Sequence, residues 1–576
     1  MAFPGIISFS PTPESVPPPN ALYRLKPPEG LPVHIHPLNP LDFVLRAAQI
    51  YPDKIALAHP DVERPVYYTY AVWAQRIQNL AYALIQAGIR PGDRVAVIAP
   101  NCPLIADIHH GVLAARAIVT PINIRLTKPE VDYILNHSVS KIILVDHEYT
   151  HLVKGSKVPV IVSQDTGRAG DPYEEFLSSG RRFSQEKGWH GLEAEANEDV
   201  GACLCYTSGT TGRPKGVITT LRSSYLAAIA NAFETRMNPE STYLWILPMF
   251  HAAGWTYPWA ITFAFACQIT LRTVSYPHIW NHLLNSNVSH YCGAPTVQIG
   301  LVNAPEAKTL DRPVFAIIAG SAPTAHLIGE LEKRGIQSVH VYGLTIYTRT
   351  FKTLGPFTRN YFQPSWRLLS HNERSKLCAR QGHSFATAQQ ARVVYTAEED
   401  SVNALRDVPK DGKTIGEVIT RGNIVMKEYF RDPDATRKAF QGHHFHSGDL
   451  AVWYPDGSIG IVDRSKDIII SGGENASSVA IEQELAEHED VLEVSVVARP
   501  HPKWGERPMA FVVLREEAIR RWAMKHNKFA EDLKRHAKGR LPGFACPEWV
   551  EVVPELPKTS TGKILKTQLR QYVAKL

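Results

Sequence analysis

The sequence predicts an α/β protein in which a large N-terminal domain of layered α/β subdomains precedes a small α+β domain. The chain has 576 residues, which is too many for one hydrophobic core. From residue 41 onward, strand-like and helix-like patterns alternate, as they do where helices cover parallel sheets. The pattern changes near residues 463–467. We therefore expect two domains, over residues 41–463 and 464–576.

The expected elements of the first domain follow from proline content and from the spacing of apolar residues. Residues 1–40 are rich in proline and lack a periodic apolar pattern, so they are expected to form an extended arm. Apolar residues at helical spacing predict a helix over 70–87, which ends at a break over 88–92. Short apolar runs predict strands over 94–98, 141–145, 158–162 and 202–206.

The second domain is shorter and mixes both kinds of pattern. Strand-like runs cover residues 467–470, 491–497 and 509–514. Helical patterns cover residues 479–487 and 516–539. Residues 464–576 are therefore expected to form an α+β unit with its own core.

Composition excludes several classes of protein. The formal net charge of +6 is small for this length and no basic run accompanies it, which argues against nucleic acid as a partner. The seven cysteines are scattered without a CxxC pair, so a reducing compartment is expected and a structural zinc site is not. The N-terminus lacks a basic region followed by an apolar stretch, so no secretory signal is expected.

Residues 241–271 carry no Asp, Glu, Lys or Arg, and a stretch of this length could span a bilayer. The stretch also holds Pro248, His251, Gly254 and Pro258, which do not suit a continuous membrane helix. We expect a buried strand, a loop and a packed helix here, and no membrane span.

The most informative segment follows the strand expected over 202–206 and reads Ser208-Gly-Thr-Thr-Gly-Arg-Pro-Lys215-Gly-Val217. Glycines let backbone N–H groups approach a ligand, hydroxyls add donors, and a lysine offsets phosphate charge. This composition predicts a polyphosphate-binding loop, although the Walker-type spacing is absent. The predicted phosphate-binding residues are Thr207, Ser208, Gly209, Thr210, Thr211, Gly212 and Lys215.

The loop resembles the phosphate loop of the adenylate-forming (AMP-binding) enzymes, and further segments of the chain resemble other motifs of that family in the same order. They are YLWILPMFHAAGW around His251, IIAGSAP over 317–323, VYGLT over 341–345, HSGDL around Asp449, VDRSKDIIISGGENASS over 462–478 and PKTSTGK ending at Lys563. Within the family, the sequence most resembles the acyl-CoA synthetase or acid–CoA ligase branch of plant and fungal peroxisomal enzymes.

The resemblance implies ATP, Mg²⁺ and coenzyme A as substrates and cofactor. Asp449 and Arg464 are expected to hold the ribose, Tyr342 to stack on adenine, and Thr345 and Lys563 to act at the α-phosphate. Besides the loop residues named above, the implied ATP-binding residues are Gly320, Ser321, Ala322, Tyr342, Gly343, Thr345, Asp449, Arg464 and Lys563.

The resemblance also divides the remaining chemistry between the domains. His251 and Trp255 are expected at the acyl pocket, with His251 also near the thioester-forming channel. The small domain is expected to be mobile about a hinge at Lys466. After it rotates, Gly472, Gly473 and Glu474 would line the pantetheine channel.

One position departs from the family pattern. The family has a magnesium-binding glutamate directly after Tyr-Gly-x-Thr, whereas Thr345 is followed here by Ile346. Residues 346–354 look altered, with a few residues inserted, and no Asp or Glu occurs between Glu332 and Glu373. No metal ligand is therefore identified. An altered version of an active enzyme, a slow enzyme and a nucleotide-binding relic all remain open.

The expected function is ATP-dependent ligation of a carboxylic acid to coenzyme A through an acyl-adenylate. The resemblance favours a medium-chain, aromatic or secondary-metabolite acid, a mycotoxin precursor among the last. An adenylating enzyme with another acceptor and an inactive nucleotide-binding protein are the alternatives. The sequence closes with Ala574, Lys575 and Leu576, which resembles the peroxisomal Ser-Lys-Leu signal, so an import receptor is an expected partner, with the cytoplasm as the other location.

Overall fold

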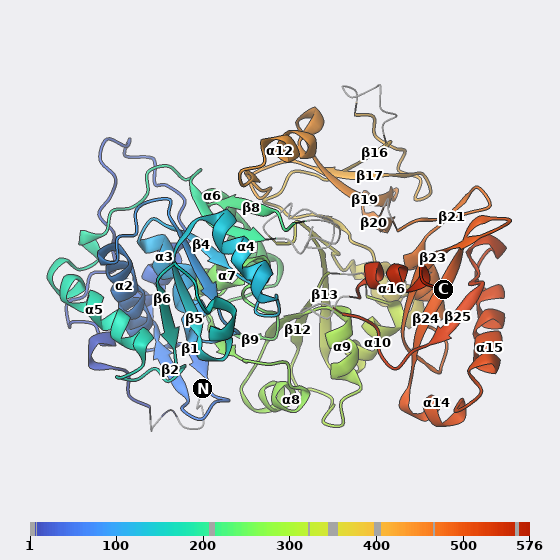
Figure 1. Ribbon diagram of the computed structural model, residues 1–576, viewed down its shortest axis with the longest axis horizontal. Helices are drawn as coiled ribbons and strands as arrows, with labels where there is room; N and C mark the ends of the chain where they lie inside the picture. The colour runs from blue at the N-terminus through green and yellow to red at the C-terminus, as the bar shows by residue number, and fades with distance from the viewer. Residues whose placement is uncertain are drawn as a thin grey trace.

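The computed structural model describes residues 6, 9–206, 213–320, 323–343, 355–396, 405–464, 467–558 and 564–576. Its four sheets lie in two bodies joined near residue 464, as Figure 1 shows, with the C-terminal body at the red end of the chain. The region between the sheets of the larger body and the smaller body holds the candidate site described below. The fold is therefore the layered α/β class that the sequence predicts.

A seven-stranded sheet carries the segment that leads into the phosphate loop. Strands β7, β4, β3, β5 and β6 are parallel, and β8 and β18 add antiparallel pairs at the edge opposite β6. In spatial order the strands are β18 (Glu428–Tyr429), β8 (Gly216–Thr220), β7 (Gly201–Tyr206), β4 (Ile118–Pro121), β3 (Arg94–Ile98), β5 (Ser140–Asp146) and β6 (Val160–Ser163).

A nine-stranded sheet forms the second layer. Its strands from β13 through β1 are parallel, which suits the nearly complete burial of β9, β11 and β12. In spatial order they are β15 (His383–Ser384), β14 (Thr358–Arg359), β13 (Ile336–Tyr342), β12 (Val314–Ile318), β11 (His290–Gly293), β9 (Thr242–Trp245), β10 (Cys267–Thr270), β1 (Ile55–His59) and β2 (Val66–Thr69).

Two smaller antiparallel sheets complete the molecule. The four-stranded sheet consists of β16 (Arg392–Val394), β17 (Ile415–Thr420), β19 (Phe445–Trp453) and β20 (Ile459–Arg464). The C-terminal sheet consists of β22 (Glu474–Ala476), β21 (Ile469–Ser471), β24 (Gly505–Leu514) and β23 (Val491–His501), with β25 (Trp549–Val552) parallel to β24.

Helices cover the two large sheets and both faces of the C-terminal sheet (Figure 1). In the larger body they are α1 (Leu41–Ile50), α2 (Tyr70–Gln86), α3 (Pro103–Ala114), α4 (Lys128–Ser138), α5 (Pro172–Lys187), α6 (Leu221–Glu234), α7 (Tyr257–Phe263), α8 (Tyr276–Asn285), α9 (Pro295–Val302), α10 (Ala325–Lys333), α11 (His371–Cys378) and α12 (Pro433–Ala439). In the C-terminal body they are α13 (Ser478–Leu485), α14 (Glu516–Arg521), α15 (His526–Lys538) and α16 (Lys566–Val573).

Local sequence explains where several helices begin. Thr69 caps α2 by accepting a hydrogen bond from the Val72 N–H, and Thr127 with Glu130 forms a capping box at α4. Helix α2 is buried almost all round between α3 and α5. At the contact with α5, a Cβ on Gly180 would lie only 2.1 Å from the Asn79 carbonyl oxygen, so this close approach requires glycine.

Most predicted elements are present, with bounds that differ by a few residues from the prediction, and one predicted element is wrong. The helix expected over 516–539 is two helices, α14 and α15. The break lies at Trp522–Lys525, where Met524 adopts a left-handed φ of 60°. Over residues 9–40, the proline-rich arm contains a short 3-10 turn at Pro13–Ser15 and a bridge from Lys26 to Glu193, and Leu25 is buried.

The uncharged stretch at 241–271 contains β9, the 3-10 turn His251–Thr256, α7 and β10. This is the strand, loop and packed helix that the sequence predicts. Among the residues that the structure describes, no helix combines the length and the apolar character needed to cross a bilayer.

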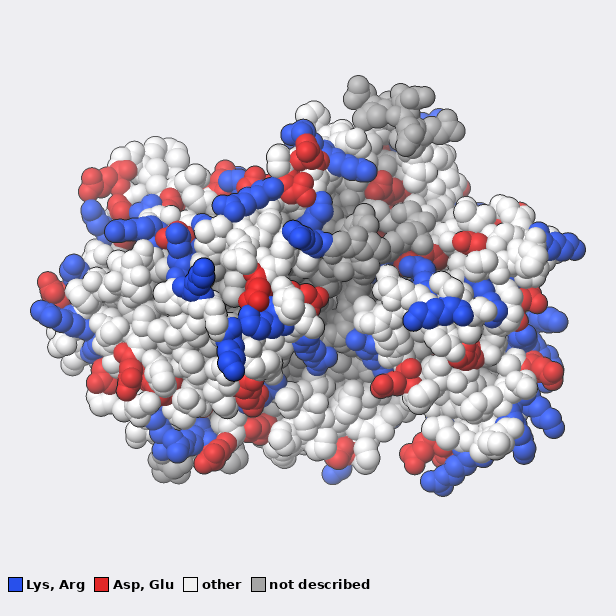
Figure 2. Space-filling model, in the orientation of Figure 1, with Lys and Arg blue, Asp and Glu red and all other residues white. Residues whose placement is uncertain are grey.

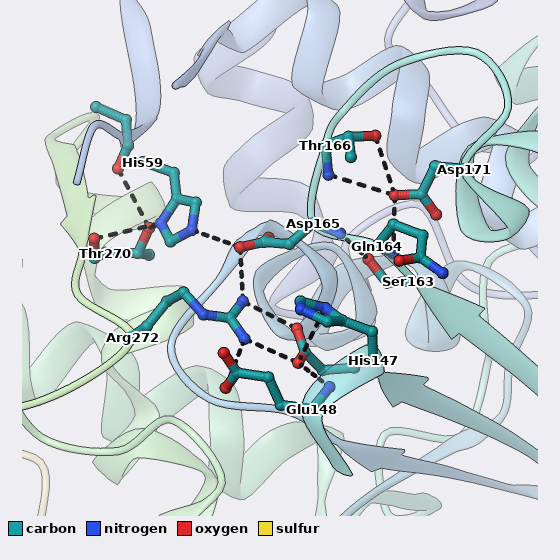
Figure 3. A network of polar contacts seen from close by, with 12 residues as sticks. His59, His147, Glu148, Ser163, Gln164, Asp165, Thr166, Asp171, Thr270 and Arg272 are labelled. Carbon is teal, nitrogen blue, oxygen red and sulfur yellow. Dashed lines mark hydrogen bonds and ion pairs between the residues drawn. The ribbon is translucent and has the colours of Figure 1, made fainter. Parts of the chain in front are cut away.

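A buried polar network ties the seven-stranded sheet to the nine-stranded sheet (Figure 3). Arg272, just beyond β10, pairs with Asp146 at 2.8 Å and with Asp165 at 2.6 Å, at the carboxyl ends of β5 and β6. His59, at the end of β1, contacts Asp165 at 2.9 Å and Thr270 at 2.6 Å. These contacts fix the relative placement of the two sheets that border the candidate site.

Candidate active site

A cavity of about 310 Å³ opens where β13 and β20 end and the C-terminal body begins. Its larger-body lining includes Gly320, Tyr342, Gly343, Asp449 and Arg464, all of which the sequence assigns to nucleotide binding. These residues come from the nine-stranded and four-stranded sheets. The structure therefore brings together five predicted residues from separate segments of the chain.

The polar core of this cavity is formed by Asp449, Tyr342 and Arg464. Asp449 and Arg464 are cross-strand partners in β19 and β20, and the Arg464 Nε lies 4.0 Å from an Asp449 carboxylate oxygen. The Tyr342 hydroxyl donates to the other Asp449 oxygen at 2.7 Å. Burial, with the nearby Asp449 carboxylate, holds the pKa of Tyr342 well above its usual range, so its hydroxyl is a donor at neutral pH. A carboxylate with an adjacent guanidinium suits a vicinal diol.

The same arginine reaches the C-terminal body. Its guanidinium lies 3.6 Å from Asp467, which also pairs with Arg570 on α16. The neighbouring Asp463 accepts hydrogen bonds from the Ser478 backbone N–H at 2.7 Å and from its hydroxyl at 2.6 Å. The start of α13 is therefore attached to β20, across the predicted hinge position.

The C-terminal body contributes the opposite wall of the cavity. Ile564 and Leu565 line it, and they immediately follow Lys563 in sequence. A bridge from Lys558 to Ile564 and a hydrogen bond from the Leu565 N–H to the Pro557 oxygen fix this segment. The neighbours of the predicted catalytic lysine thus face the predicted nucleotide residues.

The predicted phosphate loop is bounded by two paired strands. Tyr206 at the end of β7 pairs with Gly216 at the start of β8, so the two strand ends that bound the loop lie side by side. Lys215 lies 2.8 Å from the Asp432 carboxylate and 5.3 Å from the Tyr429 ring centroid. Neither contact was predicted from the sequence.

His251 and Trp255 lie in the 3-10 turn His251–Thr256, and both side chains are buried. They do not belong to the lining of the 310 Å³ cavity. Gly254, Trp255 and Thr256 have consecutive positive φ angles of 55°, 53° and 66°. Asn231 on α6 holds this strained turn by donating to the Trp255 oxygen at 3.0 Å and to the Thr256 hydroxyl at 2.7 Å.

Of the predicted pantetheine residues on the C-terminal body, Gly472 and Gly473 form the β21–β22 turn and Glu474 begins β22. Gly472 and Gly473 have φ angles of 63° and 88°, which only glycine adopts readily, and Gly472 packs on the Trp504 ring. Glu474 is exposed. None of the three lines the cavity, so they are separate from the predicted nucleotide residues in this arrangement.

Several predicted residues lie outside the described part of the chain. They are Thr207, Ser208, Gly209, Thr210, Thr211, Gly212, Ser321, Ala322, Thr345, Ile346, Lys466 and Lys563. The targeting residues Ala574, Lys575 and Leu576 follow α16 and are exposed.

A Mg²⁺ ion prefers oxygen ligands, chiefly from carboxylates, phosphates and water. Asp449 already accepts from Tyr342 and faces Arg464, so it is not an open oxygen ligand. Within the described residues, one group of three close ligands exists, Cys102 with Asp146 and Asp165. It contains a thiol and is occupied by the Arg272 guanidinium. The described residues therefore do not fit a resident Mg²⁺ site.

Lys and Arg side chains are interspersed with Asp and Glu over the face seen in Figure 2, and basic groups border the hollow between the two bodies.

Sequence reasoning missed Asp432, Asp463, Asp467 and Arg570. Asp463 and Asp467 lie inside the quoted VDRSKD motif, whereas nothing local distinguishes Asp432 except its place before a proline at the start of α12.

Comparison with known proteins places this geometry in a family. Residues 44–430 match the AMP-binding enzyme family, and residues 480–563 match the AMP-binding enzyme C-terminal domain. The chain belongs to the AMP-binding enzymes. Enzymes of this family that form acyl-CoA use ATP, Mg²⁺ and coenzyme A.

Relatives match this AMP-binding enzyme along nearly its whole length. The peroxisomal acetate/butyrate–CoA ligase of Arabidopsis thaliana is 37% identical, with 94% of this chain and 95% of the relative covered. The peroxisomal benzoate–CoA ligase of the same plant is 35% identical over 93% of each chain. The ATP-bound structure of MatB from Rhodopseudomonas palustris has a TM-score of 0.77 at 22% identity, covering 93% of this chain and 99% of that one. This last likeness concerns the fold.

Proposed function

We propose that this AMP-binding enzyme is an ATP-dependent acid–CoA ligase. The observation that carries the proposal is the cavity in which Asp449, Arg464 and Tyr342 face the residues that follow Lys563. The CoA-ligase relatives, which cover more than nine-tenths of the chain, support the same reaction class.

In the first half-reaction, a carboxylate oxygen of the acid attacks the α-phosphorus of ATP. A new P–O bond forms, the bond to the β-phosphate oxygen breaks, and pyrophosphate leaves. Asp449 would bind the ribose hydroxyls, with Arg464 beside it and Tyr342 holding one carboxylate oxygen. Thr207–Gly212 would donate to the departing phosphates, and Lys563 and Thr345 would contact the α-phosphate. Magnesium would enter with the nucleotide, and no step here is assigned to it.

In the second half-reaction, the thiol of coenzyme A loses its proton and its sulfur attacks the acyl carbon. A C–S bond forms, the C–O bond to AMP breaks, and AMP leaves with the electron pair. The β21–β22 turn lies away from the cavity, so Gly472, Gly473 and Glu474 would reach the acyl group only after the C-terminal body rotates about Lys466. Contacts such as that of Asp463 with Ser478 would break in this rotation.

For the acid, we propose a monocarboxylic acid of the small aliphatic, medium-chain or aromatic class. Relatives are named for acetate, butyrate, benzoate and trans-cinnamate. His251, Trp255 and the strained turn that carries them would border the acyl group. An acid of secondary metabolism falls within the same chemistry.

The test is acid-dependent exchange of labelled pyrophosphate into ATP across a panel of these acids, with Lys563→Ala as the blank. Exchange above the blank, followed by AMP release on addition of coenzyme A, is the expected result. Exchange without a response to coenzyme A would indicate another acceptor. No exchange with any acid, but recovery when residues 346–354 are replaced by a glutamate-bearing loop, would assign the defect to that loop. ATP binding without exchange in either form would contradict the ligase proposal.

For location, we propose import into peroxisomes through Ala574, Lys575 and Leu576. Several relatives are named as peroxisomal, and the three residues are exposed beyond α16. The full chain with an N-terminal fluorescent fusion is expected in puncta that carry a peroxisomal marker. Deletion of Leu576 should give diffuse fluorescence, and diffuse fluorescence of the unaltered fusion would contradict the proposal.

A further inference from the structure

The two ends of the predicted phosphate loop are each attached to a neighbouring segment. One end is Tyr206, the last residue of β7, and the other is the stretch 213–216 that enters β8. On one side, helix α4 contacts both ends. The Tyr206 hydroxyl lies 2.8 Å from the His137 Nδ1, and the Tyr133 hydroxyl donates to the Pro214 oxygen at 3.2 Å. These contacts hold Tyr206 and Pro214, on either side of the loop, in place.

On the other side, the segment 428–436 attaches to the returning end. Strand β18 pairs with β8, and the Phe430 N–H donates to the Gly216 oxygen at 2.8 Å. One residue before Gly216, the Lys215 ammonium lies 2.8 Å from the Asp432 carboxylate and over the Tyr429 ring. The lysine that the sequence assigns to phosphate is thus directed at a carboxylate and an aromatic face.

Asp432 is itself held rigidly. Its second carboxylate oxygen accepts from the Ala435 N–H at 3.0 Å as the cap of α12. Its backbone N–H donates to the Tyr429 oxygen at 3.1 Å, and its backbone oxygen accepts from the Thr436 hydroxyl at 2.9 Å. The Lys215 ammonium holds the pKa of this carboxyl below its usual range, so the partner is charged at neutral pH.

We propose that Asp432 is a positioning residue for the phosphate loop, and that Lys215 fixes the returning end of the loop instead of neutralising a phosphate of ATP. A lysine paired at 2.8 Å with a fixed carboxylate presents little net charge to a phosphate. The same pair joins the returning end of the loop, at Lys215, to the cap of α12, so it fixes the position of that end. This inference rests on the proposed function, because it assigns ATP phosphates to residues 207–212.

Both side chains are about one-third exposed, at 34% and 36%, so the pair contributes little to global stability. An effect on ATP binding can therefore be separated from unfolding. The test uses the full chain and measures the Kd of MgATP, together with KM for ATP and kcat in the exchange reaction. The variants are Asp432→Asn, Lys215→Met, Lys215→Asp and the swap Lys215→Asp with Asp432→Lys. Asp434→Asn is the matched control, because that exposed carboxylate lies two residues away and, among the residues that the structure describes, its ion-pair partner is Arg437 alone.

If Asp432 positions the loop, Asp432→Asn and Lys215→Met should each weaken ATP binding about tenfold, since loss of alignment costs affinity and rate. The swap should recover most of the ATP affinity that Lys215→Asp alone loses, and Asp434→Asn should bind ATP as tightly as the wild type does. If Lys215 contacts phosphate, Asp432→Asn would bind ATP as well as or better than the wild type, and the swap would be no better than Lys215→Asp. That result would overturn the inference. If the wild type binds ATP without acid-dependent exchange, the ligase proposal fails, while the ATP affinities still decide the role of Asp432.

Discussion

Asp449 is a buried carboxylate whose two oxygens have different neighbours, the Tyr342 hydroxyl on one side and the Arg464 guanidinium on the other. Asp449→Asn keeps the shape but removes the charge, so exchange activity should fall roughly 10²-fold, as it does when one preorganised electrostatic partner is lost. Tyr342→Phe is the matched variant because it keeps the ring that would stack on adenine. It should lose less than about tenfold, the value of one hydrogen bond. An equal loss in both variants would mean that the Tyr342 hydroxyl, and not its ring, is the important group.

Arg76 is the centre of a buried ion cluster, 2.7 Å from Glu174 and 2.9 Å from Asp107, and it is 1% exposed. Arg76→Met leaves two buried carboxylates without their cation, which should reduce the free energy of unfolding by about 3–5 kcal/mol. Arg116→Met is the control, because Arg116 pairs with Glu193 and Glu195 in a partly exposed position and should cost less than about 1 kcal/mol. Urea midpoints measure both. Equal midpoints for the two variants would contradict the assigned role of the buried cluster.

At the scale of elements, the turn at His251–Thr256 is the most strained part of the candidate site. Two non-glycine residues in the left-handed region store roughly 1–3 kcal/mol each, and two hydrogen bonds from Asn231 hold them there. Asn231→Ala should let the turn relax, which would lower stability by about 1–3 kcal/mol and change the ranking of acids in the exchange assay without changing KM for ATP. Asn285→Ala, at an exposed asparagine at the end of α8 and away from the cavity, is the control. An unchanged ranking of acids would show that this turn does not determine which acid the enzyme prefers.

Sequence reasoning located most strands and helices because apolar spacing records burial directly, as in β3, β7 and α2. It predicted one helix in place of α14 and α15 because no local sequence pattern predicts the left-handed backbone at Met524. The sequence motifs around Asp449 and Arg464 identified both residues. The register of β19 and β20 explains why the two side chains are neighbours. The contact between Lys215 and Asp432 joins residues 217 positions apart, so no local pattern could reveal it. The strain at Trp255 was hidden for a similar reason, since Asn231 lies on another helix.

At the scale of the whole molecule, the candidate site draws on every sheet. The phosphate loop follows β7 of the seven-stranded sheet, Tyr342 ends a strand of the nine-stranded sheet, Asp449 and Arg464 belong to the four-stranded sheet, and Val494 lies on β23 of the C-terminal sheet. Networks that fix one sheet against another therefore act on the site from a distance. The contacts of Arg272 in Figure 3 join the first two sheets in this way.

The dependence of stability on pH is also a property of the whole molecule, because buried histidines occur in both large layers. Burial lowers the pKa of His109, His290 and His340 to about 4, and that of His110 to about 3. In the unfolded chain a histidine has a pKa near 6.5, so between about pH 6.5 and 4 the unfolded state binds more protons than the folded state. The free energy of unfolding should therefore fall as the pH falls through this window, by about 1.4 kcal/mol for each pKa unit and each histidine.

Urea midpoints at pH 7.0, 6.0 and 5.0 should decrease steadily. His110→Phe keeps a ring against Trp73 but cannot take up a proton, so its midpoint should decrease less than that of the wild type. His190→Gln, at an exposed position, should follow the wild type. If His110→Phe lost stability on acidification as steeply as the wild type, the buried imidazole would not be a source of the acid sensitivity, and titration of carboxylates would have to account for it.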